Sequence, residues 1–107
     1  QFLSIKERAE LIQKIYQGLV PGGILILSEK VHFDSKKRTA EISNIHHFFK
    51  ATNGYSKLEI SSKRDSLEGV LVTETESRHI YRAKELGFKN STKLMSNLNF
   101  LTYKFQK

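Results

Sequence analysis

A chain of 107 residues without cysteine excludes a disulfide scaffold, a zinc-thiolate site and a thiol nucleophile. It has no apolar run long enough to cross a bilayer and nothing like a signal peptide, so we expect a soluble, cytoplasmic protein of at most one domain. The 18 Lys and Arg residues against 11 Asp and Glu residues give a net charge of +7. This excess favours a polyanionic partner, or indicates the basic part of a longer chain.

The first predicted element is a helix that begins after Ser4. Ser4 and Glu7 have the spacing of a capping box, in which side chains satisfy the free backbone N–H groups of the first turn. Apolar residues then recur at intervals of three and four on one face: Ile5, Ala9, Ile12, Ile15, Tyr16 and Leu19. The Pro-Gly-Gly sequence at residues 21–23 ends the helix, because proline cannot continue the hydrogen-bond ladder.

Residues 24–27 are apolar without alternation, which predicts a strand covered by helices on both faces. The helix and this strand form half of a βαβ crossover whose first strand would precede Gln1. Without that strand, residues 24–27 keep an unpaired apolar edge, so we expect an oligomer or a chain that folded together with a missing half. Residues 28–30 (Ser-Glu-Lys) follow at the carboxyl end of the strand, either as a ligand-facing position or as a solvated strand end.

The middle of the chain is predicted to hold a polar loop at residues 34–38 and a helix over residues 39–52, with Ile42, Ile45, His46 and Phe49 on one side. His46 and His47 are adjacent and point about 100° apart on a helix, so they cannot share a metal ion as an i, i+4 pair can. We interpret them as packing and capping residues, and no metal site is predicted.

A second capping box follows the Asn-Gly turn at residues 53–54. Ser56 and Glu59 have the required spacing, and the Asn-Gly pair tolerates the positive φ of a tight turn. These signals predict a short helix that begins just after Ser56.

This short helix carries the candidate site residue, Arg64. Leu58 and Ile60 are predicted to point inward, and Lys63 and Arg64 lie near the far end. A guanidinium held on a capped helix suits bidentate recognition of a carboxylate or a phosphate. The alternative is that Arg64 is one surface arginine among five.

The last third of the chain is predicted to contain one more helix and two antiparallel strands. Thr73 or Thr75 caps this helix, and Gly87 ends it in a left-handed conformation. Its predicted buried stripe is Ile80, Tyr81, Ala83 and Leu86. Residues 88–107 alternate in two consecutive strands. This order predicts an α/β fold: the C-terminal half of a Rossmann-like S-adenosylmethionine-dependent methyltransferase fold ending in an antiparallel hairpin, with residues 1–107 as a single partial domain.

Several short motifs stand in an order and spacing that closely resemble the bacterial carboxy-S-adenosyl-L-methionine synthase family, once regarded as tRNA wobble-uridine methyltransferases. The resemblance runs from Gln1 to about Phe88 and continues loosely to the end. The motifs are Gln1-Phe-Leu3, Lys14-Ile-Tyr-Gln-Gly-Leu19, Pro21-Gly-Gly23, Leu27-Ser-Glu-Lys30, His46-His47, Asn53-Gly-Tyr-Ser56, Leu58-Glu-Ile-Ser61 and Lys63-Arg64.

The resemblance implies an enzyme that takes S-adenosylmethionine and prephenate, transfers a carboxylate to the sulfonium methyl carbon and releases phenylpyruvate. The product then serves to modify the wobble uridine of tRNA. The resemblance also implies a homodimer in which Arg64 is donated across the interface to the carboxylate of the ligand, while catalytic residues remain unassigned. The family's main cofactor-binding groups lie upstream of Gln1, so we expect the isolated chain to be inactive.

Two other functions are open at this point. An ordinary S-adenosylmethionine-dependent tRNA methyltransferase would not need Arg64. A non-enzymatic basic RNA-binding module would show a contiguous basic face and aromatic side chains for base stacking. The lysines here are scattered over every element, so we expect no stable binding of nucleic acid.

Overall fold

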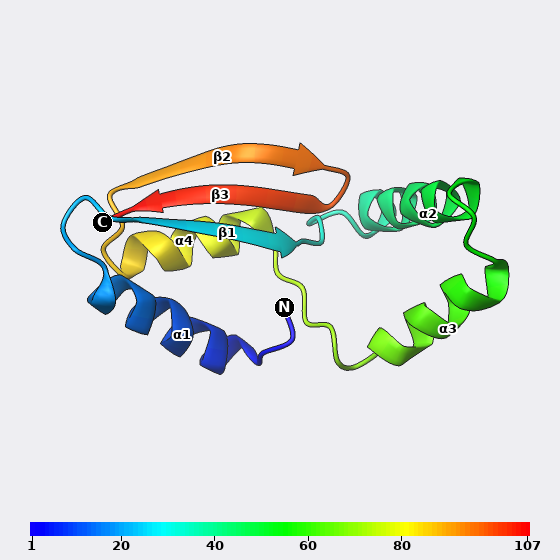
Figure 1. Ribbon diagram of the computed structural model, residues 1–107, viewed down its shortest axis with the longest axis horizontal. Coiled ribbons are helices and arrows are strands. Elements are labelled where there is room, and N and C mark those ends of the chain that lie inside the picture. Colours follow the sequence, from blue (N-terminus) through cyan, green and yellow to red (C-terminus); the bar gives the residue numbers. More distant parts are fainter.

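Three strands form one antiparallel sheet in the computed structural model, which describes residues 1–107. They are β1 (Ile24–Lys30), β2 (Asn90–Asn97) and β3 (Phe100–Gln106), in the spatial order β1-β3-β2 (Figure 1). The last strand in the sequence is therefore the central one, and Tyr103 on β3 lies opposite Leu27 on β1. The α/β class and the closing antiparallel hairpin are confirmed.

Two helices cover the same face of this sheet, α1 (Ile5–Gly18) and α4 (Glu76–Glu85) (Figure 1). Alternate residues of β3 point into this layer and are buried, because side chains on a strand alternate between its faces. Their aromatic rings lie close together, with ring centroids 5.7 Å apart for Tyr103 and Phe105 and 5.8 Å apart for Phe88 and Phe105. The core is Ile12, Val31, Ala83, Phe88, Leu101, Tyr103 and Phe105.

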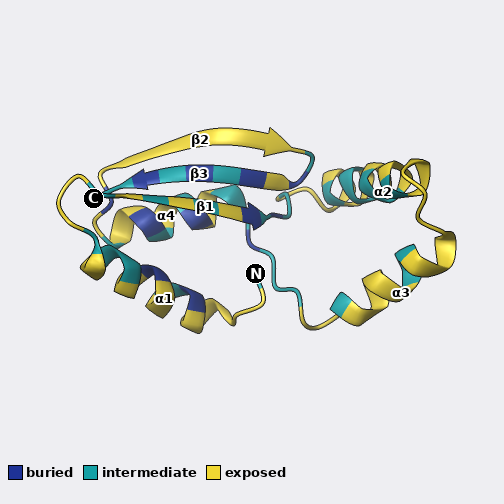
Figure 2. Ribbon diagram, viewed as in Figure 1, coloured by how far each residue is buried: buried dark blue, intermediate teal, exposed yellow.

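The prediction that β1 is buried on both faces is wrong for this chain. Ile24 and Ile26 are 51 % and 49 % exposed, whereas Leu25 and Leu27 pack against the core. The physical reason is that α1 and α4 lie on the same side of the sheet, which leaves the second face without a covering layer (Figure 2). The outer edge of β1 is also free of a strand, as the unpaired-edge prediction requires.

The ends of α1 and α4 follow their local signals closely. The Ser4 hydroxyl accepts a hydrogen bond from the Glu7 N–H at 3.3 Å, and the Ser4 N–H donates to the Glu7 carboxylate at 2.9 Å. Gly87 follows α4 with a φ of +104°, a conformation that costs glycine little. Thr75 stands at the start of α4 without a side-chain capping bond.

One residue of the predicted buried stripe of α4 is misplaced. Tyr81 is exposed, and His79 is buried instead. The ring centroids of His79 and Tyr103 lie 6.3 Å apart. His79 and Ala83 are four residues apart, so they share the inner face of the helix, and Tyr81 is rotated away from it.

The remaining two helices, α2 (Lys36–Thr52) and α3 (Lys57–Leu67), extend beyond the end of the sheet (Figure 1). We call residues 36–67 the arm. None of its residues is buried (Figure 2). The helix α2 begins earlier than predicted because the Ser35 hydroxyl accepts a hydrogen bond from the Arg38 N–H at 3.2 Å, so residues 36–38 form its first turn and not a loop. None of the four helices combines the length and apolar character needed to span a membrane.

Candidate anion-binding site

A hollow of about 560 Å³ lies where the arm meets the end of β1. Its wall consists of the last residue of β1, one face of α2, residues 60–67 of α3 and the segment that follows α3. Six of its 13 lining residues carry basic or imidazole side chains, against two carboxylates, Asp65 and Glu68. The six are Lys30, His46, His47, Lys50, Lys63 and Arg64.

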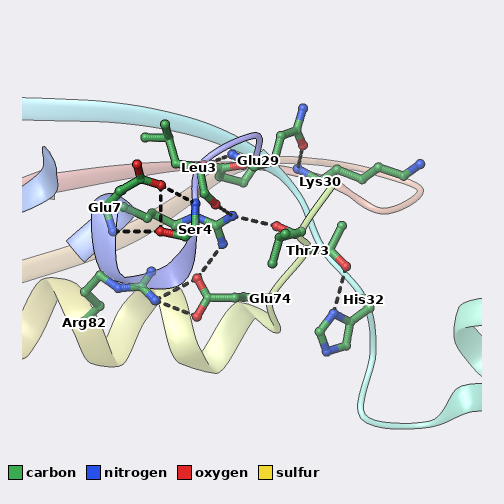
Figure 3. A network of polar contacts seen from close by, with 12 residues as sticks. Leu3, Ser4, Glu7, Glu29, Lys30, His32, Thr73, Glu74 and Arg82 are labelled. Atoms are coloured by element: carbon green, nitrogen blue, oxygen red, sulfur yellow. Dashed lines mark hydrogen bonds and ion pairs between the residues drawn. The ribbon is translucent and has the colours of Figure 1, made fainter. Parts of the chain in front are cut away.

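The base of the arm is held by polar contacts on both of its connections to the sheet. On the return segment, the Glu74 carboxylate accepts hydrogen bonds from the guanidinium groups of Arg8 on α1 and Arg82 on α4, each at 2.5 Å (Figure 3). Arg8 also donates to the carbonyl oxygen of Val72 at 2.6 Å. His32 on the outgoing segment is joined to Thr73 through its Nδ1 and the Thr73 hydroxyl, 3.0 Å apart. The hollow therefore sits on a fixed base.

Arg64 is positioned by the second capping box, as predicted. The Ser56 N–H donates to the Glu59 carboxylate at 2.8 Å, and the Ser56 hydroxyl accepts from the Glu59 N–H at 3.2 Å. This pair starts α3 and places Arg64 in its last turn. The prediction that Leu58 points inward is wrong, since it is 75 % exposed, whereas Ile60 lines the hollow. Two residues apart on a helix are rotated by about 200°, so they cannot share a face.

The Arg64 guanidinium already presents a two-pronged donor to a carboxylate. Its Nε and Nη2 atoms each lie 3.0 Å from the same oxygen of Asp65, and the Arg64 side chain is 65 % exposed. A surface ion pair of this kind contributes little to stability, so a ligand carboxylate can replace Asp65 at small cost. The role of Arg64 in binding a ligand carboxylate stays a prediction.

Lys30, at the end of the first strand, lines the hollow, which is the position that the ligand-facing alternative for residues 28–30 requires. Its ammonium lies 5.9 Å from the centroid of the Phe100 ring, at the start of β3. Burial, and then the positive charge of Lys50, lower the pKa of Lys30 below its usual value. The middle residue of the trio, Glu29, is buried and lies outside the hollow.

The two adjacent histidines also line the hollow, which the sequence interpretation as packing and capping residues missed. His46 packs edge-on against Phe100, with 5.6 Å between the ring centroids. Burial, followed by the charge of Lys50, lowers the pKa of both His46 and His47. A signal was present, because Ser43, His46, His47 and Lys50 are spaced by three and four residues on one helix face. The structure contains no group of three or more side chains that could hold a metal ion.

Comparison with known proteins identifies the relatives of this chain, although no family model matches it. It is 48 % identical over 103 residues to the carboxy-S-adenosyl-L-methionine synthase of Hydrogenovibrio crunogenus, covering 96 % of this chain and 41 % of that protein. The chain is a homologue of the carboxy-S-adenosyl-L-methionine synthases. The synthase of Pasteurella multocida is 46 % identical over 100 residues, covering 94 % and 42 %, and that of Ruthia magnifica is 43 % identical over 103 residues, covering 96 % and 44 %.

The resemblance inferred from the short motifs is thereby confirmed. The chain spans about two-fifths of the length of the curated synthases it matches. The name of these synthases gives carboxy-S-adenosyl-L-methionine as the compound that they make.

Proposed function

We propose that this chain is the C-terminal half of a carboxy-S-adenosyl-L-methionine synthase with a Rossmann-like methyltransferase fold. The enzyme transfers a carboxylate from prephenate to the methyl carbon of S-adenosylmethionine, in the cytoplasm, and its product serves the modification of the tRNA wobble uridine. The observation that carries the proposal is the cationic hollow around Arg64, in a chain that is similar to curated synthases of this name. A methyl donor has no carboxylate next to its sulfonium, whereas the carboxylated compound does and needs a cation beside it.

The proposed reaction balances without an oxidant or a reductant. A methyl C–H bond of S-adenosylmethionine breaks, and a C–C bond forms to the carboxyl carbon that leaves prephenate. The bonds from the prephenate ring to this carboxyl group and to its hydroxyl group break, which gives phenylpyruvate, and the departing hydroxyl takes up the methyl proton to leave as one molecule of water. The new product carries a carboxylate next to the sulfonium, which distinguishes it from its precursor.

Arg64 is proposed to bind this new carboxylate. Its guanidinium already forms two hydrogen bonds to a carboxylate oxygen in the structure. Charge-assisted contacts of this type contribute about 1.5–3 kcal/mol, which corresponds to roughly tenfold to hundredfold discrimination. Lysine would lose the planar fork that makes the contact bidentate.

We also propose a homodimer in which Arg64 is donated to the ligand of the partner copy. Support comes from the arm, which extends from the sheet and carries exposed apolar side chains without a covering layer. Contact with a second copy would remove them from water, as dimer interfaces do. The exposed apolar residues of the arm are Ile45, Phe48, Phe49, Tyr55 and Leu58.

The cofactor-binding groups are proposed to lie in the part of the relatives that this chain does not span. S-adenosylmethionine would then bind the isolated chain weakly or not at all, and the isolated chain would be inactive.

The test is a chimera in which this chain replaces the matching segment of the Hydrogenovibrio crunogenus synthase. With S-adenosylmethionine and prephenate, mass spectrometry should detect a product heavier than S-adenosylmethionine by a carboxylate. Arg64→Ala should lower kcat/KM roughly tenfold to a hundredfold, with partial recovery in Arg64→Lys. Arg78→Ala, on the exposed face of α4, is the matched control and should have no effect.

Two outcomes would overturn the proposal. One is methyl transfer to tRNA that survives Arg64→Ala without any carboxylated product, which would identify a tRNA methyltransferase. The other is a chimera that runs as a monomer in sedimentation while it remains fully active, which would exclude donation of Arg64 across a dimer.

A further inference from the structure

The hollow contains more positive charge than one ligand carboxylate requires. Arg64 is paired with Asp65, yet Lys30 and Lys50 line the same hollow without an ion pair. We propose that Lys30 and Lys50 form a second anion subsite beside Arg64, so that the hollow takes a small molecule with two anionic groups. The inference rests on the proposed function and extends it: the ligand that Arg64 contacts across the dimer interface reaches into this hollow, and the second subsite holds the carboxylate that the donor retains after transfer.

The two lysines approach the hollow from different elements. Lys30 is the last residue of β1, and Lys50 lies in the last turn of α2. Phe100 supports the arrangement, because Lys30 lies over its ring and His46 packs against its edge. His46 and Lys50 are four residues apart and so share one face of α2. Phe100 therefore contacts both Lys30 and His46, which lies one helical turn from Lys50, before any ligand arrives.

The electrostatics of the hollow favour an anion with two charged groups. The facing groups are Lys30 from β1, His46, His47 and Lys50 from α2, Lys63, Arg64 and Asp65 from α3, and Glu68 from the segment after α3. Burial lowers the pKa of Lys30, His46 and His47, and among the neighbouring charges that of Lys50 lowers each of these values most. A second anionic group beside Lys50 removes this repulsion, in addition to forming its own hydrogen bonds.

The size of the hollow favours a small molecule over a polymer. A volume of about 560 Å³ lies within the range of sites for small ligands. Binding of RNA would call for a contiguous basic stripe with aromatic platforms for stacked bases. The exposed aromatic residues Phe48 and Phe49 of the arm are outside the hollow. A dicarboxylate therefore suits the site better than a phosphodiester chain.

The first experiment follows the imidazole resonances of the 107-residue chain by NMR during titration with malonate, and separately with acetate, at constant ionic strength. Malonate is expected to bind at least roughly tenfold more tightly than acetate and to raise the pKa of His46 and His47. His32 and His79 lie outside the hollow and serve as internal references. Lys30→Ala and Lys50→Ala should each weaken malonate binding roughly tenfold, whereas Lys14→Ala, on the exposed side of α1, should not.

The second experiment uses the chimera described above and does not depend on the isolated chain. Lys30→Ala and Lys50→Ala should raise KM for prephenate at least roughly tenfold and leave KM for S-adenosylmethionine close to its original value. Equal binding of malonate and acetate, or unchanged KM for prephenate in both variants, would overturn the inference. Saturation of the hollow by a short single-stranded RNA at a lower concentration than malonate would also overturn it.

The two proposals fail in different ways. Loss of the second subsite leaves the Arg64-dependent synthase activity of the chimera in place. Loss of synthase activity, with the malonate site and its lysine dependence intact, leaves a dicarboxylate site without the proposed reaction.

Discussion

The body of the molecule and its arm are built on opposite principles. The body, made of α1, the sheet, α4 and the segments next to them, contains every buried residue of the chain, and the arm contains none (Figure 2). The arm instead contributes most of the basic side chains around the hollow. Stability and binding are thus separated, as is common where binding elements are drawn from the less stable parts of a fold.

The arm is nevertheless ordered by specific local devices. Ser35 and Ser56 cap its two helices, and the Arg8–Glu74–Arg82 cluster fixes the segment by which it returns to the body. We therefore expect substitutions in the body to lower the stability of the whole chain, and substitutions in the arm to have small effects that stay within the arm.

Replacing one phenylalanine by alanine in the body and one in the arm should show the largest difference between the two regions. Phe105→Ala removes a fully buried ring from the aromatic cluster and should lower the free energy of unfolding by about 3–5 kcal/mol. Phe48→Ala removes a ring that is 71 % exposed and should change it by no more than about 0.5 kcal/mol. Urea denaturation measures both. Similar losses in the two variants would contradict the division into body and arm.

Glu74→Gln should have the next largest effect. It leaves the buried Arg8 guanidinium and the half-buried Arg82 guanidinium without a counter-ion, at a cost of about 3 kcal/mol. Burial raises the pKa of Glu74, but the hydrogen bonds and charges of Arg82 and Arg8 outweigh burial and hold it below 4.5. The wild-type advantage should therefore be fully present above pH 4.5 and shrink as the pH falls through the lower folded pKa.

Denaturation of both proteins between pH 3 and pH 7 checks this result. Glu85→Gln, at the exposed end of α4, is the control and should match the wild type at every pH. A gap between Glu74→Gln and wild type that stays constant down to pH 3 would show that the charge of Glu74 is not its source.

Ser56→Ala is expected to affect the arm alone. Loss of the cap leaves the N–H of Glu59 without its partner, so amide exchange in α3 should be roughly fivefold faster, while exchange in β3 stays unchanged. Ser66→Ala in the same helix is the matched control, because its hydroxyl only donates to the Lys63 carbonyl within the helix. Faster exchange in β3 would show that the arm and the body unfold as one unit.

The smallest expected effect is a shift in histidine titration. The pKa values of His46 and His47 should lie below 6.5, because burial and then the charge of Lys50 oppose protonation. A folded pKa below the unfolded value means that the stability of the arm is complete above pH 6.5 and falls as the pH drops through that range. In Lys50→Ala, NMR titration should show both values closer to 6.5. Unchanged values would exclude Lys50 as a cause.

Much of the local structure could be predicted from the sequence alone. The capping boxes at Ser4 and Ser56, the left-handed Gly87 and the closing hairpin all depend on groups within about four residues of each other or on simple alternation. The capped helix and its guanidinium are visible in the sequence and made Arg64 a candidate, whereas its role as a ligand contact comes from the resemblance and stays a prediction. The relationship to the synthases was visible in motif order.

Only the tertiary structure decided which faces meet. Periodicity cannot tell that α1 and α4 share one side of the sheet, so the exposure of Ile24 and Ile26 and the burial of His79 were missed. Periodicity also does not show that Lys30 and Lys50 line the same hollow, or that Phe100 contacts both Lys30 and His46. The physical reason is range: caps and turns satisfy backbone groups locally, whereas the hollow depends on contacts between residues up to 70 positions apart.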